Sequence, residues 1–290
     1  IDPSKPMGAL TFDDGPHDTW SNAILDVLEE NHALATFFEV GRNVRAHPEP
    51  VQRMAELGCE IASHSNAHKD LSKLKKKTLI KDLDTADAAF TDAGVEPPAL
   101  VRPPYGAVNK NVKSATGRSI VTWTVDTEDW RSRDAQAVID YVQNYGDLDG
   151  EIVLMHSIYE STADAVRVLV PWLQEQGYQL VTVTELLAYY YGELPQPDRF
   201  YGYTYFSGHG RTDTPVPLPG ETVPGAGVPA EEETPDTPAA LADEPEAPAE
   251  SESPAEEAPA ETDKEWKPVR VPDTVDLAPA SIPNPALFMP

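Results

Sequence analysis

The sequence predicts an α/β fold, with a parallel sheet that is either open or closed into a barrel. Over residues 1–206, short apolar runs alternate with segments in which apolar side chains recur at helical spacing. This alternation is typical of parallel sheets, because each helix carries the chain back to the edge where the next strand begins. Polar clusters also follow several apolar runs directly, and in α/β folds the functional face lies at the carboxyl ends of the strands.

The expected strands are short apolar runs bounded by polar or turn residues. In chain order they are Met7–Phe12, Ala35–Val40, Glu60–Ser63, Ala99–Arg102, Ile120–Val125, Glu151–His156 and Gln179–Val183. Between them, the expected helices are Trp20–Glu30, Glu49–Leu57, Thr78–Ala93, Asn111–Thr116, Ala135–Tyr145, Thr162–Gln176 and Val183–Tyr191. The longest apolar stripe shows the reasoning: Val166, Leu169 and Leu173 share one helical face, and Gly177 then ends that helix.

Composition changes near residue 207, where we place a domain boundary. Residues 207–290 contain 17 of the 29 prolines, and Glu221–Asp263 contains no Lys or Arg. Such a segment buries too little apolar surface to offset its ordering entropy, and its like charges repel. We therefore expect a folded domain over residues 1–206, followed by a disordered, extended Pro/Ala/Glu-rich tail over residues 207–290. The apolar residues that return near the end leave a short docking peptide as an alternative there.

The overall charge narrows the classes of partner. The formal net charge is −27, which disfavours nucleic acid and anionic membranes, since both reward clusters of Lys and Arg. No apolar run approaches the ~18–20 residues that span a bilayer, and the single cysteine, Cys59, excludes an internal disulfide. Because the chain begins at Ile1 rather than Met, we expect a processed or trimmed chain; a signal peptide or anchor removed in that way leaves no trace in this sequence.

Two histidines and two aspartates in these strand-end clusters suggest a metal site. His64 and His68 are four residues apart, which on a helix or helical turn places both imidazoles on one face. Asp13 and Asp14 end an apolar strand, where two adjacent carboxylates require a compensating cation or solvent. Two imidazoles and one carboxylate form a catalytic zinc set, and the other aspartate would serve as general base. Taken singly, these residues also fit solvated histidines and a surface turn.

Adjacent strand residues point to opposite faces of a sheet. Asp13 and Asp14 therefore both reach one site only if the strand ends and bends there, which Gly15-Pro16 would allow. His156 ends another strand, and Asp129 is a candidate partner that would raise the pKa of His156 and suit it to act as a general acid. Arg102 is a candidate partner for the aspartate base.

Five segments in this order resemble the motifs of the polysaccharide deacetylases, the NodB-homology group of carbohydrate esterase family 4. They are TFDDGP (Thr11–Pro16), HSNAH (His64–His68), RPPYG (Arg102–Gly106), DTEDW (Asp126–Trp130) and LMH (Leu154–His156). The resemblance covers roughly residues 5–190 and implies a distorted (β/α) barrel, usually with seven strands. It implies that a divalent ion, commonly zinc and sometimes cobalt or nickel, is bound by Asp14, His64 and His68.

The same resemblance assigns the remaining roles. It implies that Asp13 is the general base and that Arg102 tethers it. His156 would be the general acid, tuned by Asp129. The backbone N–H of Tyr105 would help to stabilise an oxyanion, and the substrate-binding side chains Trp130 and Leu154 would line a small pocket for the acetyl methyl group, next to Tyr105.

These roles lead to an expected function. We expect a metal-dependent hydrolase that removes acetyl groups from N-acetylglucosamine residues of peptidoglycan or a chitin-type oligosaccharide. The alternatives are an acetylxylan esterase that uses the same site and a non-catalytic glycan-binding domain. A polysaccharide substrate fits a secreted or envelope-attached protein, whose acidic tail would contact the cell wall or another envelope component.

Overall fold

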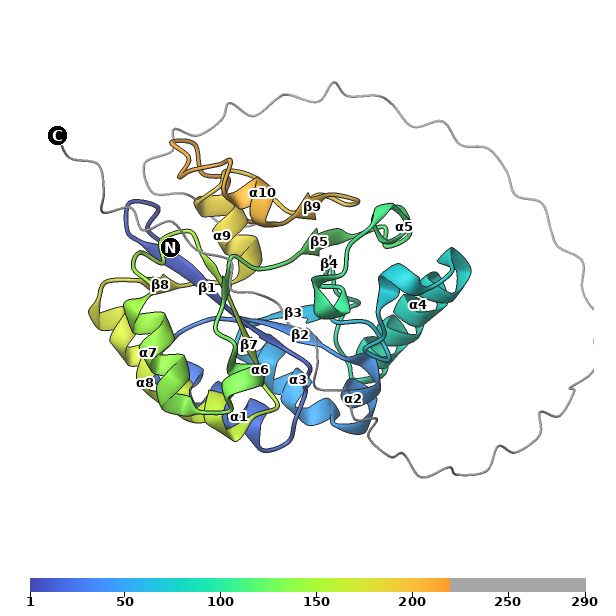
Figure 1. The fold of residues 1–290 in the computed structure, drawn as a ribbon, viewed down its shortest axis with the longest axis horizontal. Helices are drawn as coiled ribbons and strands as arrows, with labels where there is room; N and C mark the ends of the chain where they lie inside the picture. The colour runs from blue at the N-terminus through green and yellow to red at the C-terminus, as the bar shows by residue number, and fades with distance from the viewer. Residues whose placement is uncertain (220–290) are drawn as a thin grey trace, which may run out of the picture. The chain divides into compact units, whose positions relative to one another are not determined.

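The computed structural model describes residues 1–219 (Figure 1). The strands are β1 (Met7–Asp13), β2 (Thr36–Glu39), β3 (Glu60–Ser63), β4 (Leu100–Val101), β5 (Ser119–Val121), β6 (Val125–Asp126), β7 (Ile152–His156), β8 (Gln179–Leu180) and β9 (Phe200–Tyr201). The helices are α1 (Trp20–Glu30), α2 (Gly41–Ala46), α3 (Pro48–Glu56), α4 (Lys76–Asp92), α5 (Lys110–Lys113), α6 (Asp129–Ser132), α7 (Ala135–Asn144), α8 (Glu160–Glu175), α9 (Val183–Tyr189) and α10 (Tyr203–Phe206).

The described strands form one parallel sheet in the order β6-β7-β1-β2-β3-β4-β5-β9, and β8 pairs with β1. The strands β5 and β6 are successive in the chain, yet they lie toward opposite ends of this order. Only residues 122–124 separate them, so the two ends of the sheet must lie close together. The sheet is therefore curled into a barrel-like shape whose seam is bridged by the chain rather than by a strand ladder.

Side chains along β1 alternate between the barrel interior and the layer that lies beneath α1 and α8. Met7 and Ala9 pack with α9 in one buried cluster, and Thr11 and Asp13 follow on the same face. Leu10 and Phe12 pack in the other cluster, with α1 and α8. The last interior position of β1 is therefore occupied by a carboxylate, Asp13, at the carboxyl end of the barrel.

Amphipathic helices cover the outside of the sheet. Helix α8 packs between α1 and α7, and Figure 1 shows these three helices along one side of the sheet, with α2 and α4 in contact elsewhere. The stripe of Val166, Leu169 and Leu173 is fully or almost fully buried, as its spacing predicts. Helix α8 ends at Glu175, and Gly177 follows with a φ of 91°, a backbone conformation that glycine adopts without strain.

The predicted parallel α/β barrel is confirmed, and two element predictions are corrected. The run expected as one strand, Ile120–Val125, is two strands, β5 and β6, because the chain crosses the seam within it. The expected helical turn at His64–His68 is absent: this segment is an irregular loop in which Ser65 and His68 have φ values of 67° and 52°. The short elements α2, α6, β9 and α10 were not expected.

The described structure continues past the boundary expected at residue 206. The Arg211 guanidinium binds the carbonyl of Lys5 at 2.9 Å and Asp149 Oδ1 at 2.5 Å. The Thr212 N–H donates to the Tyr190 carbonyl at 2.7 Å. Residues 207–219 thus lie against the body of the fold, and the rest of the predicted tail, residues 220–290, is outside the described residues. Within residues 1–219, no helix has the length and apolarity needed to cross a membrane.

Candidate active site

The carboxyl ends of the strands surround one cavity of about 420 Å³. The register of the sheet explains this convergence, since Asp13 at the end of β1 pairs with Phe38 on one side and with His156 on the other. Eight residues that the sequence singled out line the cavity: Asp13, Asp14, His64, His68, Tyr105, Trp130, Leu154 and His156. The two remaining predicted residues, Arg102 and Asp129, are fully buried behind it.

Asp13 is held by a buried ion pair with Arg102. The guanidinium donates to Asp13 Oδ1 at 2.7 Å and to Thr11 Oγ1 at 2.8 Å. It also binds the carbonyls of Val121 and Thr122 at the end of β5 and lies 3.8 Å from the ring centre of Phe38. Arg102 therefore joins β1 to β5 across the barrel interior and fixes the direction of the Asp13 carboxylate.

Asp14 reaches the same cavity because the chain turns directly after β1. Alternation along β1 would point its side chain toward the helices, but Asp14 has a φ of 73°, in the left-handed region. Three donors from other segments hold this turn: Ser157 N–H to the Asp13 carbonyl at 3.1 Å, Asn43 Nδ2 to the Asp14 carbonyl at 2.8 Å and Val40 N–H to the Gly15 carbonyl at 2.8 Å. The expected bend at the end of the strand is thus present.

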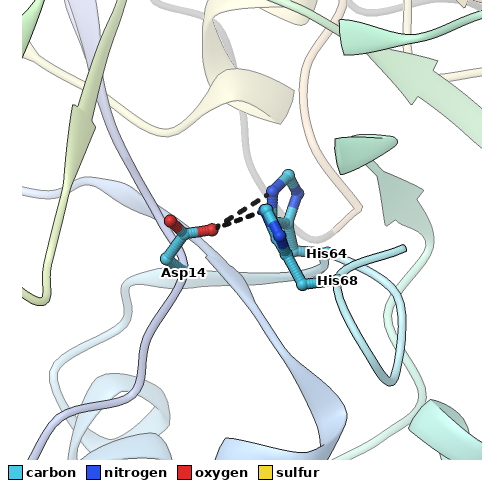
Figure 2. A group of neighbouring side chains, drawn as sticks. All are labelled: Asp14, His64 and His68. Carbon is cyan, nitrogen blue, oxygen red and sulfur yellow. Dashed lines mark ion pairs between the residues drawn. The ribbon is translucent and has the colours of Figure 1, made fainter. Parts of the chain in front are cut away.

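The Asp14 carboxylate faces both imidazoles (Figure 2). Its Oδ1 lies 3.0 Å from His68 Nε2 and 3.5 Å from His64 Nε2. His64 Nδ1 lies 2.6 Å from the Arg102 carbonyl, which only accepts hydrogen bonds, so Nδ1 carries the proton and Nε2 offers its lone pair to the cavity. Burial lowers the pKa of His64 and favours this neutral form.

The charges of this group also favour a cation. Burial raises the pKa of Asp14, but the hydrogen bond from His68 and the charges of His64 and His68 outweigh burial, and the resulting pKa is about 2. One ligand atom from each of the three residues lies within 4.8 Å of the others. Two imidazole nitrogens and one carboxylate oxygen suit a divalent transition metal with open coordination positions, so this donor set fits the predicted ion.

His156 stands across the cavity and is paired with Asp129. His156 Nδ1 lies 2.7 Å from Asp129 Oδ1, while Asp129 Oδ2 accepts hydrogen bonds from Thr162 Oγ1 at 2.6 Å and from the His156 N–H at 2.8 Å. Burial lowers the pKa of His156, but the hydrogen bond and charge of Asp129 outweigh burial and raise it above its ordinary value. The imidazolium form, which is the form that can donate a proton, is stabilised.

An apolar wall adjoins these polar groups. Trp130 is half exposed, Leu154 is buried and Tyr105 is 68% exposed at the mouth. Sequence reasoning missed three further lining residues, Trp123, Asp126 and Tyr159. Asp126 begins the quoted DTEDW motif and Tyr159 follows His156 by three residues, so proximity to the motifs was the available signal.

Glu39, at the carboxyl end of β2, was also missed. It is fully buried, and neither side-chain oxygen has a hydrogen-bond partner among the described residues. Burial, together with the negative charges of Asp13 and Asp14, raises the pKa of Glu39 well above its ordinary value, so the uncharged acid is favoured beside the two aspartates. A lone acidic residue at the end of the apolar run Ala35–Val40 was the signal in the sequence.

Comparisons with known proteins agree with this geometry. The family model described as polysaccharide deacetylase matches residues 1–122. The peptidoglycan-N-acetylmuramic acid deacetylase PdaC of Bacillus subtilis is 41% identical over 187 residues, which are 64% of this chain and 40% of that protein. A peptidoglycan-N-acetylglucosamine deacetylase of Bacillus cereus is 34% identical over 189 residues, which are 62% of this chain and 88% of that protein. The chain spans about 40% of the length of the first curated relatives that it matches.

Solved structures show the same likeness. The structure of PdaC from Bacillus subtilis aligns with a TM-score of 0.64 and 39% identity, over 65% of this chain and 93% of that one. A family 4 acetyl xylan esterase from Clostridium thermocellum, in complex with a cobalt ion, aligns with a TM-score of 0.61 and 30% identity, over 67% of this chain and 96% of that one.

Proposed function

Because the chain belongs to the polysaccharide deacetylase family, we propose that it is a metal-dependent hydrolase that removes acetyl groups from N-acetylated sugars of a glycan strand. The observation that carries this proposal is the strand register: Asp13 at the end of β1 lies directly beside His156 at the end of the neighbouring strand β7. A carboxylate and a proton-donating imidazole face one cavity that also contains a metal-ligating set. This arrangement supplies a base and an acid for acyl transfer to water, and an ion held by that set would act as the electrophile.

Asp14, His64 and His68 would hold the ion, and we propose zinc, with cobalt or nickel as alternatives. Bound there, the ion would polarise the acetyl carbonyl and increase the acidity of a water molecule. The chain's own contribution is the orientation of these ligands, since the Arg102 carbonyl fixes the His64 tautomer and Asn43 holds the backbone of Asp14.

The proton transfers are assigned to the two groups on β1 and β7. Asp13, directed by Arg102, accepts a proton from the attacking water as the water oxygen bonds to the acetyl carbon. The backbone N–H of Tyr105 donates to the developing oxyanion. His156, held as imidazolium by Asp129, gives its proton to the amine nitrogen as the carbon–nitrogen bond breaks. The products are acetate and a free amino sugar, and Trp130 and Leu154 accommodate the methyl group.

We propose peptidoglycan as the glycan, on N-acetylglucosamine or N-acetylmuramic acid units. Relatives at 41% and 34% identity carry peptidoglycan deacetylase names, whereas the acetyl xylan esterase structure is 30% identical. Chitin-type oligosaccharides share the acetamido group and remain alternatives. Acetylxylan, which carries acetyl esters instead, is the other alternative. A peptidoglycan substrate implies a secreted or envelope-attached protein whose acidic tail contacts the wall or another envelope component.

Acetate release tests this proposal. Chelator-treated protein is assayed on peptidoglycan, chitotetraose and acetylxylan, with and without added zinc. We expect zinc-restored release from the first two substrates. Release from acetylxylan alone would keep the chemistry but replace the substrate, and zinc-independent release would contradict the metal assignment. His64→Ala should abolish tight zinc binding in a calorimetric titration, since it removes one of three ligands.

A further inference from the structure

A second groove, of about 540 Å³, opens beside the catalytic cavity. Tyr159 lines both spaces, so a ligand in the groove would lie next to the reacting sugar. The groove contains none of the proton-transfer or metal-ligating residues. The charged residues that line the groove are one cation, Arg133, and three acids, Asp134, Glu160 and Asp164.

Arg133 is fixed at the junction of the two spaces. It has a φ of 51°, its Nε donates to the Trp130 carbonyl at 2.7 Å, and its guanidinium lies 3.3 Å from the centre of the Tyr159 ring. Within residues 1–219, Arg133 forms no ion pair. A guanidinium stacked on a ring keeps its terminal N–H groups in one plane, which is the geometry that binds a carboxylate through two hydrogen bonds.

One acidic side chain of the groove is also unpaired. Asp134 accepts from the N–H groups of Gln136 and Ala137 as the N-cap of α7, and Asp164 lies 3.8 Å from Arg167 Nε. Glu160, exposed in the first turn of α8, forms no ion pair among the described residues. The groove thus offers one cation and one anion that pair neither with each other nor with a neighbour.

We propose that this groove binds the peptide substituent of a peptidoglycan strand while the catalytic cavity holds the adjacent acetylated sugar. Arg133 would bind a peptide carboxylate and Glu160 a peptide amino group. This inference rests on the proposed function and narrows it, because a zwitterionic peptide distinguishes peptidoglycan from chitin and xylan, whose neutral backbones offer neither charge. The unpaired charges of opposite sign in one groove are the observation that selects this ligand.

The test compares three substrates of similar length: a peptide-bearing peptidoglycan fragment, the same glycan after amidase removal of the peptide, and chitotetraose. Arg133→Gln and Glu160→Gln should each lower kcat/KM about tenfold on the peptide-bearing fragment, mainly through KM, which corresponds to about 1.4 kcal/mol. On chitotetraose, both variants should stay within about twofold of the wild-type value. Arg131→Gln is the matched control, since Arg131 is exposed nearby and pairs with Glu128, outside the groove.

The other outcomes overturn the inference. An equal loss on the peptide-free glycan would show that Arg133 recognises the sugar's own carboxylate. An equal loss on all three substrates would show that Arg133 only supports Tyr159, and no loss on any would show that the groove is unused. Failure of the proposed function is a separate result, namely no acetate from any substrate with the zinc-loaded wild-type protein. Calorimetric binding of the already deacetylated peptide-bearing fragment tests the groove without turnover: Arg133→Gln should weaken it about tenfold, and equal binding refutes the inference.

Discussion

Arg102→Met tests the buried ion pair on which the geometry of the site depends. Both partners are buried, and the guanidinium also satisfies Thr11 Oγ1 and two carbonyls at the end of β5. Methionine fills much of the same volume but leaves the Asp13 carboxylate unpaired in the barrel interior. Breaking a buried ion pair in this way lowers the free energy of unfolding by about 3–5 kcal/mol.

Urea unfolding in the presence of a chelator, followed by tryptophan fluorescence, measures this change without a contribution from metal binding. A loss of 3–5 kcal/mol should lower the midpoint by about 1–2 M urea. The double variant Arg102→Met, Asp13→Leu removes both charges and should regain part of the lost stability, while remaining inactive. A single-variant loss below about 1 kcal/mol, or a double variant no more stable than Arg102→Met, would refute the reasoning.

Three more variants probe contacts in and beneath the site. Asp129→Asn removes the carboxylate that raises the pKa of His156, so the high-pH limb of the kcat/KM profile should move to lower pH. A limb that stays in place would argue against His156 as the general acid. Asn43→Ala removes the donor to the Asp14 carbonyl and should weaken zinc binding about tenfold by calorimetry; unchanged affinity would mean that the turn holds itself. Leu169→Ala opens a cavity beneath α8 and should lower the free energy of unfolding by about 2–5 kcal/mol in urea, and a negligible change would contradict its burial.

Apolar periodicity predicted the long elements well because they are buried on one face. Helix α1 and strand β3 have the expected bounds. Periodicity could not reveal the seam, since Ile120–Val125 reads as one apolar run. Only the sheet order shows that the chain passes from one end of the sheet to the other within it. Helix α2 begins at Gly41, whose missing Cβ allows close contact with Ala86 of α4, and no local pattern announces such a contact.

The site was predictable as a set of residues but not as a geometry. The positions of Asp14 and His68 depend on left-handed backbone at each residue. Neither Asp nor His in a sequence predicts that backbone conformation. The His64–His68 spacing suggested a helical turn, yet the two ring centres lie 5.0 Å apart in an irregular loop after β3. Trp123 and Glu39 were missed because aromatic and acidic residues near strands serve many purposes, and only the folded barrel places these two beside the cavity.

Asp13 is assigned as the general base and Asp14 as a metal ligand, and Asp13→Asn tests these two roles most directly. Zinc affinity and acetate release are measured on the same preparation. We expect zinc binding close to that of the wild-type protein, because Asp14, His64 and His68 would be the ligands. We also expect kcat to fall at least about a hundredfold, because the base is lost. Wild-type turnover by Asp13→Asn, or loss of the zinc site in this variant, would contradict these roles of the two aspartates.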